Sequence, residues 1–159
     1  MKVSDLQNVF IEELKILLTD WKFVKSQRHF KKNEGDVNWY LHISCINHIN
    51  DFDAVGNVAV EFKAGNERIC IVGAELGNIE GIGQHRFQIS NSAEATSSAL
   101  GIHEYFKEHG LPFLYKYSDP SEVVSTLQKG GTEAMLISPL LNKHQDQINQ
   151  LSSHYELSM

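Results

Sequence analysis

Histidine is the first residue type in this chain that suggests chemistry, because imidazole titrates near neutral pH and binds transition metals. The sequence holds eight histidines. The set that comes nearest to a metal site is His42, His48, Asp51 and Asp53, with His85 as a more distant member. It contains no His-x-His, no His-Glu-x-x-His and no cysteine pair at ligand spacing, which are the local patterns that hold zinc. Scattered surface histidines explain the set, and we expect no metal and no cofactor.

Residue types that serve as nucleophiles or acid–base pairs are present, but not in a recognised arrangement. No serine lies in a Gly-x-Ser-x-Gly sequence. Cys45 and Cys70 lie within apolar stretches, where a buried thiol is inert. The adjacent carboxylates Glu12 and Glu13 are more typical of a solvated surface than of a catalytic pair. We therefore expect no catalytic residue, which favours a non-catalytic protein over an enzyme.

A glycine-rich run, LGNIEGIG at residues 76–83, invites comparison with a phosphate-binding loop. Such a loop directs backbone N–H groups at the anion from the N-terminus of a helix. Here residues 85–89 follow the run and alternate like a strand, and Glu80 adds a negative charge. We expect a flexible connection between strands, or a recognition loop if the run has a function.

Tyr40 and His42 are the candidate binding residues with the clearest placement. Both fall on the polar side of an alternating strand, and an outward tyrosine is typical of an interaction surface. An alternative site is a pocket between the sheet and the helices. There His42, His85 and Arg86 would converge near the glycine-rich turns, and the protein would bind a small ligand or act as an enzyme.

The charge balance restricts the class of partner. Among 159 residues, 20 are acidic and 14 are Lys or Arg, and the net charge is −6 with histidine neutral. Nucleic-acid binding usually requires basic residues gathered on one face. The only dense basic cluster lies within residues 22–32, so we expect a protein partner rather than nucleic acid.

The sequence shows neither a secretion signal nor a membrane-spanning segment. No charged leader followed by an apolar run opens the chain, and no apolar stretch approaches the length that spans a bilayer. The two cysteines do not make a disulfide framework, which fits a reducing compartment. These features predict a soluble, cytoplasmic protein without a membrane partner.

The first half of the chain reads as one helix followed by strands. Apolar residues recur at helical spacing from Leu6 to Trp21, with Ser4 as the N-cap and Gln7 completing a capping box. The period then changes to two. Strands are expected at residues 28–32, 37–45, 57–64, 67–76 and 87–89, with a turn at 33–36 and a hairpin at Gly65-Asn66. Odd positions of the 37–45 strand should face inward, and the 67–76 strand, apolar on both sides, should be central or covered.

Helical spacing returns after Ile89. A helix capped at residues 90–92 should end at Gly110, and another should begin at Asp119-Pro120 and run to residue 128. A last helical segment from Thr132 should break before Pro139.

This order of elements predicts an α+β fold. It comprises an N-terminal helix, an antiparallel meander of about four or five strands and C-terminal helices packed on one face, because no βαβ alternation is present. No linker separates two units, so residues 1–159 should form a single domain. The core should be built from large apolar residues with inward parity: Phe10, Leu14, Trp39, Leu41, Val60, Phe62, Ile71, Phe87 and Phe106.

Three short segments carry a family resemblance that extends over most of the chain. The opening helix leads into WKFVK at 21–25 and RHFKK at 28–32, and LPFL at 111–114 follows a later helix. This layout resembles a broad group of small uncharacterised bacterial domains, some of which are thought to be immunity proteins of toxin systems. No catalytic residue is established for that group. The resemblance implies a binding protein, and the acidic balance would suit a basic toxin partner.

Overall fold

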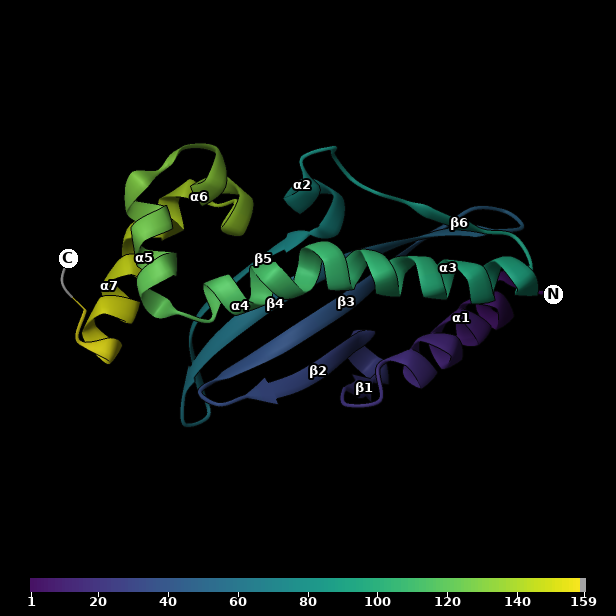
Figure 1. Cartoon of the computed structure of the whole chain (residues 1–159), viewed down its shortest axis with the longest axis horizontal. Coiled ribbons are helices and arrows are strands. Elements are labelled where there is room, and N and C mark those ends of the chain that lie inside the picture. The colour runs from purple at the N-terminus through teal and green to yellow at the C-terminus, as the bar shows by residue number, and fades with distance from the viewer. Residues whose placement is uncertain (158–159) are drawn as a thin grey trace.

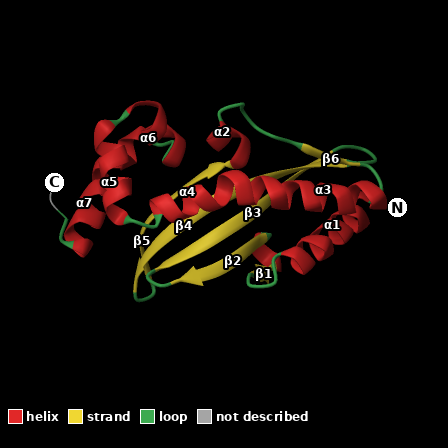
Figure 2. Cartoon of the chain, in the orientation of Figure 1, coloured by secondary structure: helices red, strands yellow, loops and turns green. Residues whose placement is uncertain are grey.

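An antiparallel sheet forms the centre of the molecule, and helices lie over one of its faces (Figure 1). The computed structural model describes residues 1–157. The strands are β1 (Lys22–Val24), β2 (His29–Glu34), β3 (Val37–Asn47), β4 (Phe52–Ala64), β5 (Glu67–Glu75) and β6 (Phe87–Ile89). The helices are α1 (Val3–Leu17), α2 (Leu76–Glu80), α3 (Ser92–Tyr105), α4 (Leu111–Tyr117), α5 (Pro120–Lys129), α6 (Gly131–Ile137) and α7 (His144–Tyr155). Figure 2 shows the strands gathered in one sheet, with helices in front of it and beside it, so the predicted α+β class is confirmed.

The first five strands follow one another in space in the order β1-β2-β3-β4-β5, and each is antiparallel to its neighbour. The predicted meander is therefore confirmed. β6 pairs with the first residues of β4, from Phe52 to Ala54, where β5 no longer runs alongside. This arrangement leaves β5 at one edge of the sheet over most of its length.

The alternation of β3 places its odd residues toward the helices. Trp39, Leu41 and Ile43 are at most 2% exposed, which confirms the inward parity predicted for this strand. The inward residues of the neighbouring strands continue the layer, because Trp39 pairs with Val60 and Leu41 with Phe30. One face of the sheet is thus a continuous apolar surface.

The helices close over this apolar face through aromatic contacts. The ring of Phe10 on α1 meets that of Phe52 edge-on at 6.1 Å, and Trp21 meets Phe106 at 5.5 Å. Figure 1 shows α1, α3 and α4 in front of the sheet, with α5, α6 and α7 gathered beyond the β5 side. The predicted packing of C-terminal helices on one face is confirmed.

Two strand predictions need correction, the start of β4 and the omission of β1, and one is confirmed. β4 begins at Phe52 rather than at residue 57, because the β3–β4 hairpin stays in register back to the Asn47–Phe52 pair. The prediction that residues 67–76 form a central or covered strand is confirmed in its second form, because β5 lies at the edge of the sheet and contacts α6 and α7. The short strand β1 was not predicted.

Two helix boundaries also differ from the prediction. Ser4 lies inside α1, whose N-cap is Lys2, and makes no capping hydrogen bond. The glycine-rich run is not a flexible connection throughout, because its first five residues form α2. The Glu75 side chain caps this short helix by accepting hydrogen bonds from the backbone N–H groups of Gly77 and Asn78. That carboxylate is supplied by the end of β5, so the helix depends on the strand before it.

Gly110 does not stop the helix as its residue type suggested. The chain continues from α3 through a π-helical turn, Phe106–Gly110, into α4. A Cβ atom at Gly110 would lie 2.7 Å from Cδ1 of Phe106 and 3.1 Å from Cδ2 of Leu76. Glycine is needed here for close packing rather than for a left-handed cap.

The core contains most of the predicted residues. Phe10, Leu14, Trp39, Leu41, Val60, Phe62 and Phe106 are all buried. Phe87 is only partly buried but packs against this core, whereas the prediction for Ile71 was wrong. Ile71 has the parity of the opposite face, since it pairs with Glu61. In the described part of the chain no helix is both long and apolar enough to cross a membrane.

Candidate interaction face

The second face of the sheet is formed by the residues that alternate with the core. Tyr40, His42 and Ser44 on β3 are all partly exposed, so no described helix covers the middle of this surface. We call it the open face. Its residues, assigned by strand pairing, are Lys22, Val24, His29, Lys31, Asn33, Asn38, Tyr40, His42, Ser44, Ile46, Asp53, Val55, Asn57, Ala59, Glu61, Lys63, Arg68, Ile71, Gly73 and Glu75.

Glu61 is the centre of a hydrogen-bond network on the open face. It is only 6% exposed, because Asn38, Tyr40 and Arg68 surround the carboxylate. Oε1 accepts a hydrogen bond from the Tyr40 hydroxyl at 2.8 Å and one from the Asn38 amide at 3.1 Å. Oε2 accepts one from Nε of Arg68 at 2.8 Å. Asn33 extends the network by donating to Asn38 at 3.1 Å.

The network changes the acidity of its members in opposite directions. Burial alone would raise the pKa of Glu61, but the hydrogen bonds from Asn38, Tyr40 and Arg68 outweigh it and lower that pKa. Burial and the bond to Glu61 raise the pKa of Tyr40 to about 12. The face therefore holds an ionised carboxylate and a neutral phenol over the physiological range. Neither group has the poised acidity of a general base or acid near neutral pH.

Two histidines lie beside this network. His29 and His42 are paired across β2 and β3, and the His29 ring lies 4.7 Å from the Tyr40 ring. The Lys31 ammonium lies 6.0 Å from the centre of the Tyr40 ring. Burial lowers the pKa of both histidines, and nearby positive charge lowers it further. At neutral pH they present uncharged imidazole edges beside a tyrosine.

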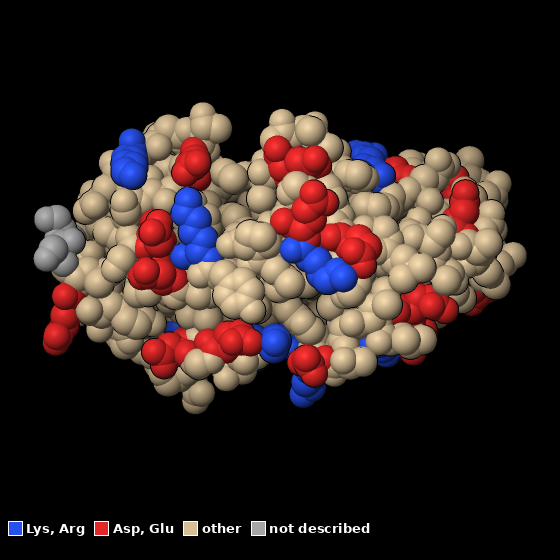
Figure 3. Space-filling view, in the orientation of Figure 1, with Lys and Arg blue, Asp and Glu red and all other residues tan. Residues whose placement is uncertain are grey.

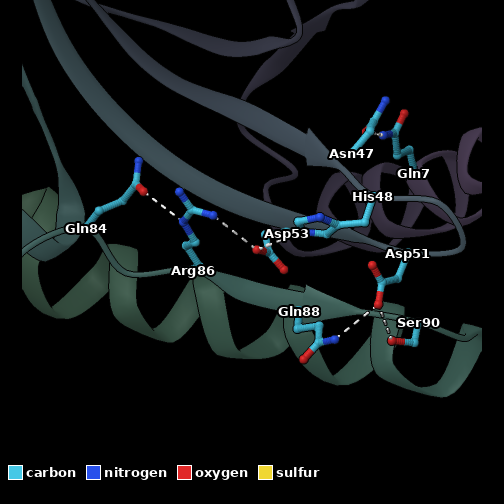
Figure 4. Close-up of polar contacts among 9 residues, drawn as sticks. All are labelled: Gln7, Asn47, His48, Asp51, Asp53, Gln84, Arg86, Gln88 and Ser90. Atoms are coloured by element: carbon cyan, nitrogen blue, oxygen red, sulfur yellow. Dashed lines mark hydrogen bonds and ion pairs between the residues drawn. The ribbon is translucent and has the colours of Figure 1, made fainter.

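A second polar cluster lies at the far end of the sheet, where β3, β4 and β6 meet (Figure 4). Asp53 accepts from His48 at 3.2 Å and lies 3.5 Å from a guanidinium nitrogen of Arg86. Asp51 accepts from Gln88 at 3.1 Å and from Ser90 at 3.3 Å. These bonds tie the β3–β4 turn to β6, which is a structural role.

The predicted binding residues separate onto two sides of the sheet. Tyr40 and His42 lie on the open face as expected. Arg86 reaches the same side through Asp53. The ring of His85 instead stacks on Phe87 at 4.4 Å and contacts Tyr105 of α3 at 4.5 Å, on the helical side.

The alternative pocket does not assemble from its three residues. His42 and His85 point to opposite sides of the sheet, and within residues 1–157 none of the five main cavities is lined by His42, His85 or Arg86. The candidate metal set disperses as well. His48 and Asp53 form a pair, whereas His42 pairs with Asn57 further along the strands. Within residues 1–157 no three His, Cys, Asp or Glu side chains come together as a metal site would require.

An apolar groove of about 1000 Å³ lies beside the edge strand β5, between α2 and α6. Figure 3 shows it as a notch between the surfaces of these two helices. Val72, Gly73, Met135 and Leu136 contribute to its walls. The Gln147 amide donates to the Ile71 carbonyl at 3.4 Å, so Ile71 directs its backbone polar groups away from β4. By antiparallel alternation those of Gly73 face the groove.

The sequence analysis missed Glu61, Asn38 and Arg68 as members of one site. A glutamate inside an apolar strand was a usable signal, since a strand interior rarely leaves a carboxylate without partners. The partners themselves lie 23 and 7 residues away and depend on strand register.

Comparison of the chain with family models, with curated proteins and with solved structures found no match.

Proposed function

We propose that the protein is a non-catalytic domain that binds a partner protein on the open face of its sheet. The observation that carries this proposal is the ordered network around Glu61, which holds Tyr40 and Arg68 in place at an uncovered surface. Tyrosine and arginine supply a large share of binding energy at protein interfaces. Fixing them before binding reduces the conformational entropy lost on association.

The dimensions of the open face suit such a role. β3 has 11 residues, which corresponds to about 36 Å at about 3.3 Å per residue. The main path of five strands is about 19 Å wide at a spacing of about 4.8 Å. The product, about 700 Å², is the most that the face could offer, because β1 and β2 are shorter than β3. It is of the same order as the roughly 800 Å² that each partner contributes to a standard interface.

The chemistry of the face favours binding over catalysis. Glu61 is engaged by three donors, and the hydroxyl of Tyr40 is held neutral, so no free acid–base pair remains there. An immunity-like role, in which the partner is a toxin, is one form of this proposal. This form of the proposal specifies what the partner is and requires no further feature of the open face.

Comparative capture tests the proposal. His42→Glu introduces a charge at the centre of the open face, and Gln128→Glu introduces the same charge on exposed α5. We expect the wild-type chain and Gln128→Glu to retain one protein from lysate of the native cell, and His42→Glu to lose it. Amide exchange in the purified complex should then slow along β2 and β3. Equal capture by both variants would exclude the open face as the binding surface. If the wild-type chain captures no protein at any salt concentration, the proposed partner-binding function is excluded.

The groove beside β5 favours a second candidate, the binding of an apolar small molecule. Its volume of about 1000 Å³ falls at the upper end of the range for ligand sites, which is about 300–1,000 Å³. Native mass spectrometry of freshly purified protein tests this candidate. A retained small molecule that Leu136→Lys abolishes would support it, and a mass equal to that of the chain alone would argue against it.

A further inference from the structure

The charges that remain free on the open face are positive, although the whole chain carries −6. The face contains three carboxylates, and all three have internal partners. Glu61 is bound by Arg68, Asp53 by His48 and Arg86, and Glu75 accepts from backbone N–H groups at the start of α2.

The lysines of the same face have no such partners. Lys22, Lys31 and Lys63 have no carboxylate within 4.0 Å among the described residues, and the described lysines that form such pairs, Lys15, Lys32 and Lys107, lie off this face. Lys22 and Lys31 are directly opposite each other on β1 and β2. Two like charges side by side are unfavourable in the free protein, and an anion between them would relieve the repulsion.

A recess of about 560 Å³ lies at one end of the face, between the β2–β3 and β4–β5 turns. Lys31 and Lys63 line it together with the amides of Asn33 and Asn38, and His154 lies at its rim. Asp36 is the one carboxylate that lines it. The Asn33 amide already donates to Asn38 and to the Val37 carbonyl, and the Asn38 amide donates to Glu61. The two ammonium groups are therefore the donors of this recess that suit a carboxylate.

We propose that the partner presents an acidic segment to the open face, and that one of its carboxylates enters the recess between Lys31 and Lys63. This inference rests on the proposed function and specifies its partner. It also reverses the partner charge expected from the sequence, because net charge averages over surfaces that a partner never contacts. Figure 3 shows acidic side chains gathered over α2 and the nearby part of α3, on the helical side. A partner on the open face does not meet them.

Direct binding tests the inference with defined probes. A fluorescein-labelled glutamate-rich peptide is compared with a matched lysine-rich peptide and with an oligo-deoxythymidine by fluorescence anisotropy. The wild-type chain should bind the acidic peptide alone or most tightly. Affinity should fall steeply between about 0.01 M and about 0.15 M salt, where the Debye length shrinks from about 30 Å to about 8 Å.

Two variants of equal charge separate a local site from a global effect. The double variant Lys31→Glu/Lys63→Glu should weaken acidic-peptide binding at least about tenfold. The double variant Lys2→Glu/Lys129→Glu changes the net charge equally at exposed helix ends, the N-cap of α1 and the last residue of α5, and should retain wild-type binding. Unchanged thermal midpoints for both variants exclude misfolding as the cause.

Three results would overturn the inference. They are no binding of the acidic peptide, equal weakening by the two double variants, and tighter binding of the oligonucleotide than of the peptide. Different outcomes would refute the acidic partner and the proposed function. If the protein lost by His42→Glu in the capture experiment is retained by Lys31→Glu/Lys63→Glu, the function stands and the acidic partner does not.

Discussion

The two faces of the sheet are made from alternating residues of the same strands, yet different forces hold them. On the helical face, Trp39, Leu41 and Ile43 are fixed by close packing against helices. On the open face, Tyr40 and Glu61 are fixed by directional hydrogen bonds, and Tyr40 stays partly exposed. The apolar side chains of the helical face must stay buried to stabilise the fold. The hydrogen-bonded side chains of the open face stay ordered without a helix packed over them. A surface of that kind is available to a partner.

The helical face should therefore respond far more strongly to truncation. Trp39→Ala should lower the free energy of unfolding by about 3–5 kcal/mol, because it leaves a large cavity. It also leaves Ser118 without the indole N–H that now donates to its hydroxyl at 2.7 Å. Denaturant unfolding measures the change. Tyr40→Ala, one residue away on the open face, should cost clearly less. Equal losses would show that the two faces are not distinct.

Among the residues of the open face, truncation of Glu61 should lower the free energy of unfolding the most. Glu61→Ala leaves Asn38, Tyr40 and Arg68 without their shared acceptor, and we expect a loss of about 1–3 kcal/mol. Glu104→Ala is the control, since Glu104 pairs with Lys107 on the solvated side of α3. That variant should keep the wild-type unfolding midpoint. A midpoint that is also unchanged for Glu61→Ala would mean that the network does not order the face.

These two faces also differ in how far the sequence predicts them. The inward residues of β3 were predicted because alternation with period two is a local property. The network was not, because Asn38 meets Glu61 only when β3 and β4 pair in one particular register. Tyr40 and His42 were placed on the correct side by the same alternation, without their partners.

The remaining errors share this origin in tertiary contacts. α2 depends on Glu75 as its cap, and Gly110 lies within a helix because Phe106 packs against it. His85 was expected near His42 from its position beside the glycine-rich turns. The stacking partners that turn its ring toward α3, Phe87 and Tyr105, follow it in sequence by 2 and 20 residues, and no local pattern reveals them.

A smaller effect should appear in the pH dependence of stability. Burial, followed by neighbouring positive charge, holds the pKa of His29 and His42 below the ordinary value of 6.5. Below that pH the unfolded chain therefore binds more protons than the folded one. The free energy of unfolding should fall as the pH is lowered through 6.5 and level off above it.

The double variant His29→Gln/His42→Gln isolates this contribution. Unfolding midpoints measured between about pH 7.5 and about pH 5.5 should fall less steeply for the variant than for the wild type. Identical slopes would mean that the two imidazoles are as solvated in the folded protein as in the unfolded chain.

The smallest expected change concerns one oxygen atom. Tyr40→Phe removes the hydroxyl that donates to Glu61 and should cost about 0.5–1.5 kcal/mol, the usual net contribution of one hydrogen bond. Tyr115→Phe is its control, because the Tyr115 ring packs edge-on against Trp39 and its side chain is 67% exposed. Tyr115→Phe should be neutral. The pKa of Glu61 should rise in Tyr40→Phe, since one of the bonds that lower it is lost.

Measuring stability and partner binding together on Tyr40→Phe decides what the hydroxyl does. Its bond to Glu61 occupies its only proton, so it can offer a partner nothing but its lone pairs. If the hydroxyl serves only to order the face, the loss in binding free energy should not exceed the loss in stability. A larger loss in binding, with the unfolding midpoint unchanged, would mean that the partner contacts this oxygen directly. In that case the open face recognises its partner through the network itself, and Glu61 would orient a binding group rather than merely hold the strands in register.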